Sequence, residues 1–459
     1  MRFLLAPLVL FSLGVAAPAE APAAQDQALA RIATEAMKDE KAYANLQWLC
    51  DRIGHRLAGS KGLEAAVAWG QTLMKAEGFQ NVRAEKVMVP HWERLAERAD
   101  VVAPLRRPLA ILGLGGSAST PEGGIEAPVL CLAGLADLEK TPAEAVKGRI
   151  VLFTGPWRSY GPYSDVRVRG ASAAARKGAA AMLLKAFAPV SLDTPHTGVL
   201  HYDAEAAEIP AAGLSVEGAG WIERLAASGT EVRVHLDLRS RRHPDAESAN
   251  VIGEIPGTEK PEEIIVIGGH LDSWDVGQGA QDDGVGCVLS LHAAELLQRI
   301  GLRPRRTLRV VLFTNEENGS RGGKAYLEAH RSELHRHVAA IESDIGNGLI
   351  LGFSIDVGGL KAAGEARQAS ALRNLQALAP RLAPLGAARF EKGGSGVDVG
   401  PMVAAGVPGL GARHDLTKYW DIHHTAADTF DKIDKQDLRK NLAILASLLY
   451  LIGDAPERP

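Results

Sequence analysis

The chain has 459 residues, of which 46% are hydrophobic and 23% charged, and its formal net charge at pH 7 is −4. This length predicts two or three compact units, and the balanced charge provides no basic face for nucleic acid or for an acidic membrane surface. Three widely spaced cysteines, Cys50, Cys131 and Cys287, form no disulfide framework, and their odd number leaves at least one thiol free. The composition is that of a multi-domain soluble enzyme.

The chain begins with the three-part pattern of a secretory signal peptide. A basic start at Arg2 precedes the apolar run 3–15 and small residues up to Ala19. The run is shorter than the roughly 20 residues that span a bilayer, which weighs against a membrane anchor. We therefore expect a signal peptide over residues 1–19, cleaved after Ala17 or Ala19. The mature protein would be exported, periplasmic or secreted, with no membrane attachment.

The spacing of apolar residues predicts the first elements. It indicates helical stretches at 26–50 and 61–78, and a strand near 82–87. From about residue 101 to 238 the chain changes to short strands and turns, with one Ala-rich helix at 169–178. Strands in this part are expected at 127–132, 149–153 and 181–184.

The later sequence predicts the main fold. From Ala249 onward, strands alternate with amphipathic helices, which is typical of an α/β fold: a mostly parallel mixed sheet with helices on both faces. The expected strands are 264–268, 308–313, 338–342 and 407–411, and the closing helix is 435–452. We therefore divide the chain into a main domain, 26–98 and 245–455, and a smaller inserted domain, 99–244.

Three predicted strands of the main domain end in side chains that bind metals. In open parallel sheets, functional groups gather outside the carboxyl ends of the strands. A fourth contribution is the histidine pair in the segment 419–429. The candidates, in chain order, are His270, Asp272, Asp282, Asp283, Glu316, Glu317, Glu342, Asp344, His423 and His424.

The residue types favour zinc. Neutral imidazoles with carboxylates suit zinc ions that keep an open position for water. Two histidines and three carboxylates suffice to bind two metals that share one carboxylate. Two metals about 3.5–4 Å apart can activate a water and bind the carbonyl oxygen of the substrate. A single acid at a strand end is more often a helix cap or a solvated loop residue. The adjacent acids 282–283 and 316–317, however, repel each other unless a cation neutralises them.

The motifs together resemble a known family. The strings concerned are Gly-Gly-His270-Leu-Asp272, Gln-Asp282-Asp283-Gly, Asn-Glu316-Glu317, Glu-Ser-Asp344 and His423-His424-Thr-Ala-Ala-Asp-Thr. In this order they resemble the co-catalytic zinc aminopeptidase and glutamate carboxypeptidase family, most closely its carboxypeptidase Q branch. The resemblance covers nearly the whole mature chain. It implies a zinc aminopeptidase-like fold, an inserted protease-associated domain, and a cis peptide bond between Asp282 and Asp283.

The resemblance also implies a role for each residue of the site. Two Zn²⁺ ions per chain are expected. His270 and Asp344 would hold one ion, Glu317 and His424 would hold the other, and Asp282 would bridge them. Glu316 would be the general base, and Asp272 would orient the His270 imidazole. His424 is preferred to His423 because the family pattern places the ligand directly before Thr425. Glu316 and Glu317 can play different parts only if the chain turns near Asn315. The sequence around Asp398 departs from the family pattern, and we expect this residue to have a structural or pocket-lining role.

The expected function is hydrolysis of short peptides or dipeptides, with release of N-terminal amino acids. Carboxypeptidase action stays open, because cations near the motifs could anchor a substrate carboxylate. These cations are Arg321, Lys324, Arg413 and Lys418. Tyr419 is expected to line the pocket or to donate a hydrogen bond to the oxyanion.

Two other functions remain as alternatives. One is glutaminyl cyclase-like acyl transfer with one zinc, and the other is a non-catalytic binding or receptor domain of the same fold. Both are disfavoured because all five ligands are present. A short peptide is the expected partner, nucleic acid is not, and a homodimer stays open.

Overall fold

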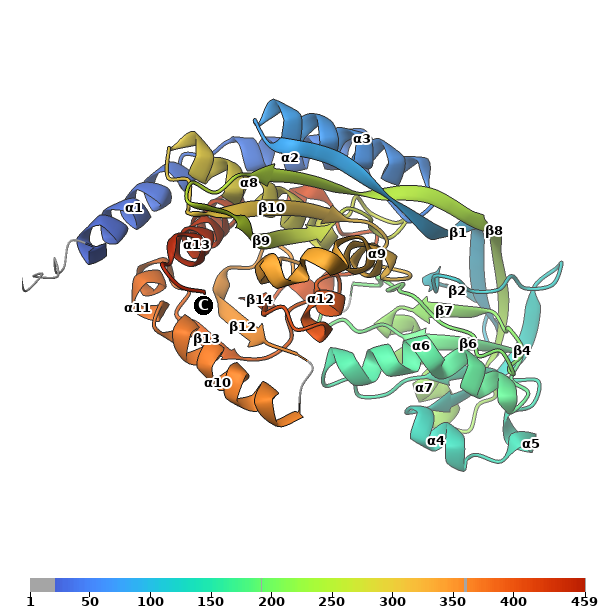
Figure 1. Ribbon diagram of the computed structural model, residues 1–459. Coiled ribbons are helices and arrows are strands. Elements are labelled where there is room, and N and C mark those ends of the chain that lie inside the picture. Colours follow the sequence, from blue (N-terminus) through green and yellow to red (C-terminus); the bar gives the residue numbers. More distant parts are fainter. Residues whose placement is uncertain (1–20, 191, 359–360, 459) are drawn as a thin grey trace, which may run out of the picture.

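The computed structural model describes residues 21–190, 192–358 and 361–458, so the expected signal peptide lies outside the described residues. In this part of the chain, strands join into one 14-stranded sheet in the order β13-β12-β14-β11-β9-β10-β8-β4-β5-β6-β7-β3, with β1 paired to β8 and β2 to β1 (Figure 1). None of the described helices is long and apolar enough to cross a membrane.

The main body contains the centre of this sheet. Its strands are β1 (Gln80–Ala103), β8 (Arg233–Ile255), β9 (Lys260–His270), β10 (Arg306–Phe313), β11 (His337–Glu342), β12 (Ile350–Asp356), β13 (Arg389–Lys392) and β14 (Gly409–His414). Its helices are α1 (Ala21–Ala36), α2 (Lys41–Trp48), α3 (Lys61–Ala76), α8 (Val285–Arg299), α9 (Arg321–His330), α10 (Lys361–Gln376), α11 (Ala379–Leu382), α12 (Gly400–Ala404) and α13 (Lys435–Asp454). Strands β14, β11, β9 and β10 run parallel, whereas β12 and β8 lie antiparallel to their neighbours β14 and β10.

Helices cover both faces of the central strands, as the sequence predicted. Along β9, Ile265 and Ile267 belong to a large core formed with α8 and α13. The alternate residues Ile264 and Val266 pack in a second core that contains Tyr326 of α9 and residues of α12. A strand buried on both faces is apolar throughout, which explains the continuous hydrophobic run in the sequence.

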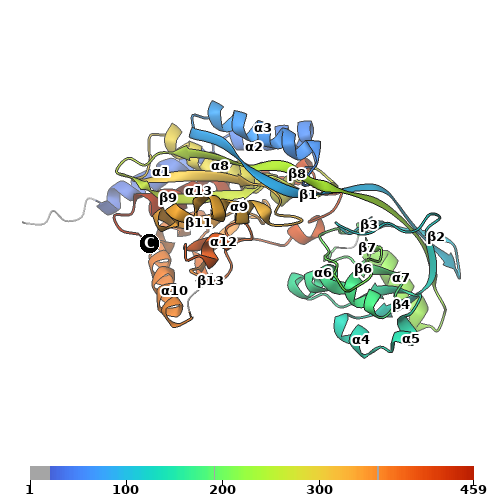
Figure 2. The same ribbon diagram turned by 45° about the vertical axis from the view of Figure 1, so that its right-hand side comes forward.

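The segment between β1 and β8, residues 104–232, is here called the inserted part. Its elements are β2 (Arg107–Leu109), β3 (Ile111–Gly113), β4 (Ile125–Leu132), α4 (Leu135–Lys140), α5 (Ala143–Val146), β5 (Ile150–Phe153), α6 (Tyr160–Arg176), β6 (Ala181–Lys185), β7 (Ala211–Leu214) and α7 (Val216–Ala227). It packs around two apolar clusters, one of its own and one that it shares with residues of β1 and β8. In Figure 2 it lies beside the main body, and the long strands β1 and β8 connect the two.

Several elements differ from the sequence-based prediction. The strand near 82–87 is only the start of β1, which pairs with β8 from Gln80 to Ala103. Strand β1 runs through the predicted domain boundary at 98/99, and β8 runs through the one at 244/245. The helix expected at 169–178 begins at Tyr160, because Pro162 in its first turn is tolerated there. Strands β12 and β13 and helix α10 were not predicted.

A buried charge network joins the N-terminal helices to α8. Glu295 is buried and accepts hydrogen bonds from Lys41 (3.0 Å) and Arg299 (2.9 Å). Burial would raise the pKa of Glu295, but His292, Lys41 and Arg299 lower it to about 2. Because the folded pKa lies below the ordinary value of 4.5, this carboxylate stabilises the fold above about pH 4.5, and the effect disappears as the pH falls toward 2.

Glu295→Gln is therefore expected to destabilise the metal-free protein at pH 7 by about 2 kcal/mol. Thermal unfolding of both proteins at pH 7 and pH 3 should show a lower Tm for the variant, with a smaller difference at pH 3. Glu259→Gln, which removes an exposed acid, serves as the control. An equal Tm difference at both pH values would show that packing, and not the charge, accounts for the loss.

Candidate metal centre

The centre lies where three parallel strands end side by side. Strand β9 is hydrogen-bonded to β10 on one side and to β11 on the other, and the register places His270 opposite Phe313 of β10. Glu316 and Glu317 follow directly after β10, and Asp344 follows β11. The sheet therefore brings these acids to the histidine, as expected for carboxyl ends of parallel strands.

The five residues expected to bind metal come together around Asp282. His270 Nε2 lies 3.1 Å from Asp282 Oδ1 and 3.2 Å from Asp344 Oδ1. On the other side, His424 Nε2 lies 3.2 Å from Asp282 Oδ2 and 3.1 Å from Glu317 Oε2. One carboxylate thus stands between two imidazoles, and each imidazole has a second acid of its own.

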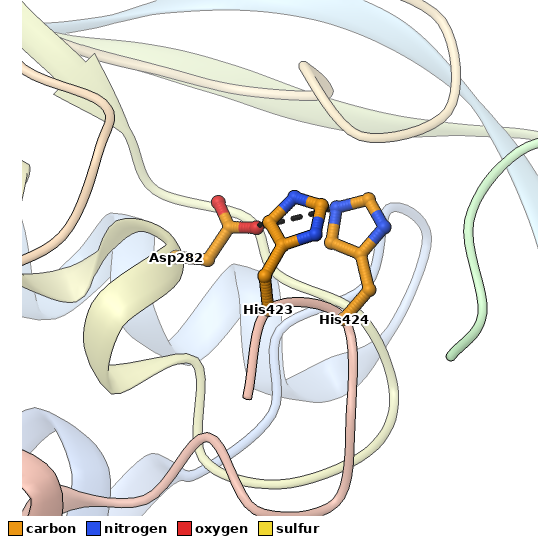
Figure 3. Close-up of side chains that lie close together, drawn as sticks. All are labelled: Asp282, His423 and His424. Atoms are coloured by element: carbon orange, nitrogen blue, oxygen red, sulfur yellow. Dashed lines mark ion pairs between the residues drawn. The ribbon is translucent and has the colours of Figure 1, made fainter. Parts of the chain in front are cut away.

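His423 also lies against this cluster. Its ring stacks on that of His424 with centroids 3.6 Å apart, and its Nε2 is 3.4 Å from Asp282 Oδ2. Figure 3 shows Asp282 pointing toward the two neighbouring rings. Distance to Asp282 alone does not separate the two histidines, but the contact with Glu317 belongs to His424.

The cluster has the chemistry of a cation site. Within the described residues, Asp282 Oδ2 and Glu317 Oε1 are buried without a hydrogen-bond partner. Burial and the neighbouring Asp282 raise the pKa of Glu317 to about 7, and burial also raises the pKa of Asp344. Buried carboxylate oxygens without a hydrogen-bond partner, gathered around imidazoles, fit a metal ion.

A turn separates the two adjacent glutamates, as the sequence required. Asn315 has a φ of 61°, in the left-handed region, so the chain reverses immediately after β10. The Asp272 carboxylate accepts the backbone N–H groups of Glu316 (3.0 Å) and Glu317 (3.2 Å) and holds this turn. The expected contact of Asp272 with His270 is made mainly by its main-chain carbonyl, 3.0 Å from His270 Nδ1, whereas the carboxylate is 3.7 Å away.

Further residues hold the backbone that carries the ligands. The Asp282–Asp283 peptide bond is cis, as the resemblance implied. Asp283 accepts the N–H groups of His270 and Gly286, both at 3.0 Å. Asp428 accepts the N–H group of Asp282 at 3.2 Å. The motifs contain both acids, but the sequence did not reveal these roles.

Arg56 supports the segment between the first two ligands and was missed by the sequence analysis. Its guanidinium is fully buried and donates to the carbonyls of Leu271 (2.6 Å), Gln278 (2.8 Å) and Gly279 (2.9 Å). These carbonyls lie between His270 and Asp282. Arg56 lies more than 200 residues before this segment in the sequence, and no local sequence pattern indicates its role.

The inserted part reaches the centre through Thr197. Its N–H donates to the His424 carbonyl at 3.0 Å, and its carbonyl lies 3.4 Å from His424 Nδ1. When Nε2 faces Asp282 and Glu317, Nδ1 carries the hydrogen and donates to Thr197. Such a contact fixes the orientation of a ligand imidazole.

A cavity of about 580 Å³ opens beside the centre. The main body contributes Glu316, Asp344, Tyr419 and Trp420 to its wall, and the inserted part contributes one face of α6. Tyr419 therefore lines the pocket, as predicted. Asp398 is fully buried and lies outside the lining, with neither carboxylate oxygen hydrogen-bonded among the described residues.

The structure shows which of the four candidate cations lie at the cavity and which do not. Arg321 pairs with Asp245, and Arg413 pairs with Glu391, so both have acid partners on the surface. Lys324 lines the cavity and donates to the Gly319 carbonyl at 3.1 Å, whereas Lys418 is not part of the lining.

The mixed sheet and the paired His–carboxylate sets at its carboxyl edge are features of the metallopeptidase class. The comparisons give the family: the chain belongs to peptidase family M28, whose model matches residues 250–449. Mouse (Mus musculus) carboxypeptidase Q is 37% identical over 94% of this chain and 89% of its own length. The resemblance found in the motifs is thereby confirmed.

Solved structures agree with this membership. A peptidase M28 precursor from Shewanella amazonensis SB2B superposes with a TM-score of 0.89 and 34% identity, covering 95% of this chain and 98% of its own. A zinc aminopeptidase from Bacillus subtilis shares the fold, with a TM-score of 0.64 and 21% identity over 91% of this chain and 98% of its own.

Proposed function

We propose that this protein is an exported, zinc-dependent exopeptidase that uses two zinc ions to release N-terminal amino acids from short peptides or dipeptides. The observation that carries the proposal is the position of Asp282 between His270 and His424, each with a second acid beside it. Membership of peptidase family M28 and the zinc aminopeptidase of the same fold support it. The inserted part is proposed to be a protease-associated domain that narrows access to the site.

The residues around the cavity suit amide hydrolysis. His270, Asp344, Asp282, Glu317 and His424 would hold the metals. When bound, two zinc ions lower the pKa of a water and polarise a carbonyl oxygen. Glu316 lines the same cavity and would accept the proton of the attacking water and deliver it to the leaving amine. Tyr419 lines the same cavity and would donate a hydrogen bond to the carbonyl oxygen of a bound peptide.

Metal removal tests the proposal. The purified mature protein should contain two zinc ions per chain by elemental analysis, and chelation should abolish release of amino acid from unblocked dipeptides. Added zinc should restore it, since the ligands are side chains that remain in place. N-acetylated dipeptides should resist cleavage if the free amine is recognised.

Two results would contradict the proposal. Full activity after complete removal of metal would exclude a metal-dependent reaction. A zinc-loaded protein that cleaves no dipeptide would leave acyl transfer from N-terminal glutamine, or binding without catalysis, as the function to pursue.

A further inference from the structure

One proposed ligand, His424, is held by a residue of the inserted part. Thr197 is fully buried, donates its N–H group to the His424 carbonyl at 3.0 Å, and places its own carbonyl oxygen 3.4 Å from His424 Nδ1. His424 has a φ of 60°, in the left-handed region that residues with a side chain seldom adopt. Such a conformation persists only where the surrounding contacts hold it. Thr197 is one of the residues that supply those contacts.

Arg94 of β1 joins Thr197 to the main body. Its guanidinium makes a two-point ion pair with Asp275, with Nε 2.8 Å from Oδ2 and Nη2 3.0 Å from Oδ1. Nη2 also donates to the Thr197 hydroxyl at 3.3 Å, and Nη1 donates to the Gly113 carbonyl at 2.8 Å. The same carbonyl accepts the Thr197 hydroxyl at 2.7 Å. One guanidinium therefore contacts both the inserted part and the main body.

Asp275 belongs to the segment 271–281, which connects two proposed ligands. The neighbouring Trp274 is buried, and its ring centroid lies 5.6 Å from that of His424. A Cβ atom on Gly115 would lie only 2.1 Å from the Trp274 ring, so the backbone of the inserted part packs directly on the indole. The ion pair is thus part of a close contact between the inserted part and a segment that carries ligands.

The ion pair is sheltered from water. The side chains of Arg94 and Asp275 are only 12% and 14% exposed, and that of Glu97, a second acid bonded to Arg94, is 13% exposed. Glu97 also accepts the Gly113 N–H group at 2.9 Å. Removing one partner of a buried ion pair is costly, because the other charge is left without compensation. Loss of Arg94 would leave two sheltered acids without this cation, so the contact should open.

We propose that Arg94 is a positioning residue that couples the inserted part to the zinc ion proposed at His424 and Glu317. The guanidinium holds Thr197 against the segment 271–281, and Thr197 holds the His424 imidazole. This inference rests on the proposed two-zinc centre. It gives the inserted part a role in metal binding besides that of narrowing access to the site.

The other half of the centre has no comparable support from the inserted part. Among the described residues, the hydrogen-bond partners of the His270 and Asp344 side chains all belong to the main body. A hydrogen bond that orients a ligand imidazole changes metal affinity by about 10- to 100-fold. Loss of Arg94 should therefore weaken the binding of one ion and spare the other.

Zinc titration of the metal-free protein tests the proposal. The wild type should bind two ions tightly, whereas Arg94→Gln should bind one ion as the wild type does and the second about 10- to 100-fold more weakly. Arg94→Lys keeps the charge but cannot make the two-point contact with Asp275, so it should recover only part of the affinity. Excess zinc should restore dipeptide hydrolysis by Arg94→Gln, which a misfolded protein would not allow.

Two further variants control for general damage to the fold. Thr197→Val removes only the hydroxyl between Arg94 and Gly113 and should weaken the same ion to a smaller extent. Arg98→Gln removes an exposed arginine of the same strand, which pairs with Asp100, and should leave both ions unchanged. The proposal is wrong if Arg94→Gln binds both ions with the wild-type affinity or weakens both by the same factor.

Hydrogen exchange separates this inference from the proposed function, because the metal-free protein reports it without zinc or turnover. Arg94→Gln should speed exchange of the Thr197 amide, whose N–H group is bonded to the His424 carbonyl, and of the segment 419–429, while β9 exchanges as in the wild type. This result would support the coupling even if the protein cleaves no dipeptide. Unchanged exchange at both places would overturn it even if two zinc ions and hydrolysis are found.

Discussion

Glu316→Gln is expected to lower kcat by about 10²–10⁴-fold while the protein keeps its full zinc content. The amide has nearly the shape of the carboxylate but cannot accept the proton of the attacking water. Zinc should remain because Glu317 makes the contact with His424, and the turn at Asn315 directs the two adjacent glutamates apart. Steady-state kinetics on a dipeptide, with zinc measured on the same sample, gives both quantities.

Measuring both activity and zinc content distinguishes the role of Glu316 from that of Glu317. Glu317→Gln should lose zinc together with activity, because Glu317 Oε2 lies against His424. Glu328→Gln, an exposed acid on α9, should change neither. If Glu316→Gln loses zinc, Glu316 is a ligand, and if it retains activity, another group is the base.

The metal centre was predictable because its ligands follow directly from the strands. His270, Glu316, Glu317 and Asp344 each lie within four residues of the end of a buried apolar strand, and neighbouring parallel strands place such ends together. The alternation of helix and strand after residue 249 was equally visible, since both faces of the sheet are covered and its central strands contain continuous apolar runs.

The parts supplied by distant segments were not predictable. Arg56 and Thr197 act on the centre through contacts more than 200 residues apart in sequence, and neither belongs to a pattern that marks a site. The extent of β1 and β8 was missed for a related reason. Their outer halves are half-exposed and charged, and the pairing with each other, rather than apolar periodicity, makes them strands.

Asp282→Asn should weaken metal binding at both proposed sites of the centre. Asp282 is the only one of the five proposed ligands that contacts both His270 and His424, with one carboxylate oxygen on each. Loss of its charge leaves each imidazole with a single acid. We expect metal affinity to fall by more than about 100-fold, the upper range for changes outside the ligand sphere, and activity to fall with it.

Equilibrium dialysis against zinc, followed by elemental analysis, measures the effect of Asp282→Asn. Asp431→Asn, which alters an exposed acid near the same loop, is the matched control and should keep two tightly held ions. A variant that still binds two ions with the wild-type affinity would mean that the two sites form independently and that Asp282 is not their bridge. Retention of one ion alone would mean that only one of the two sites depends on Asp282. Loss of both is the result that the geometry predicts, because neither His270–Asp344 nor His424–Glu317 supplies enough charge and ligand number by itself.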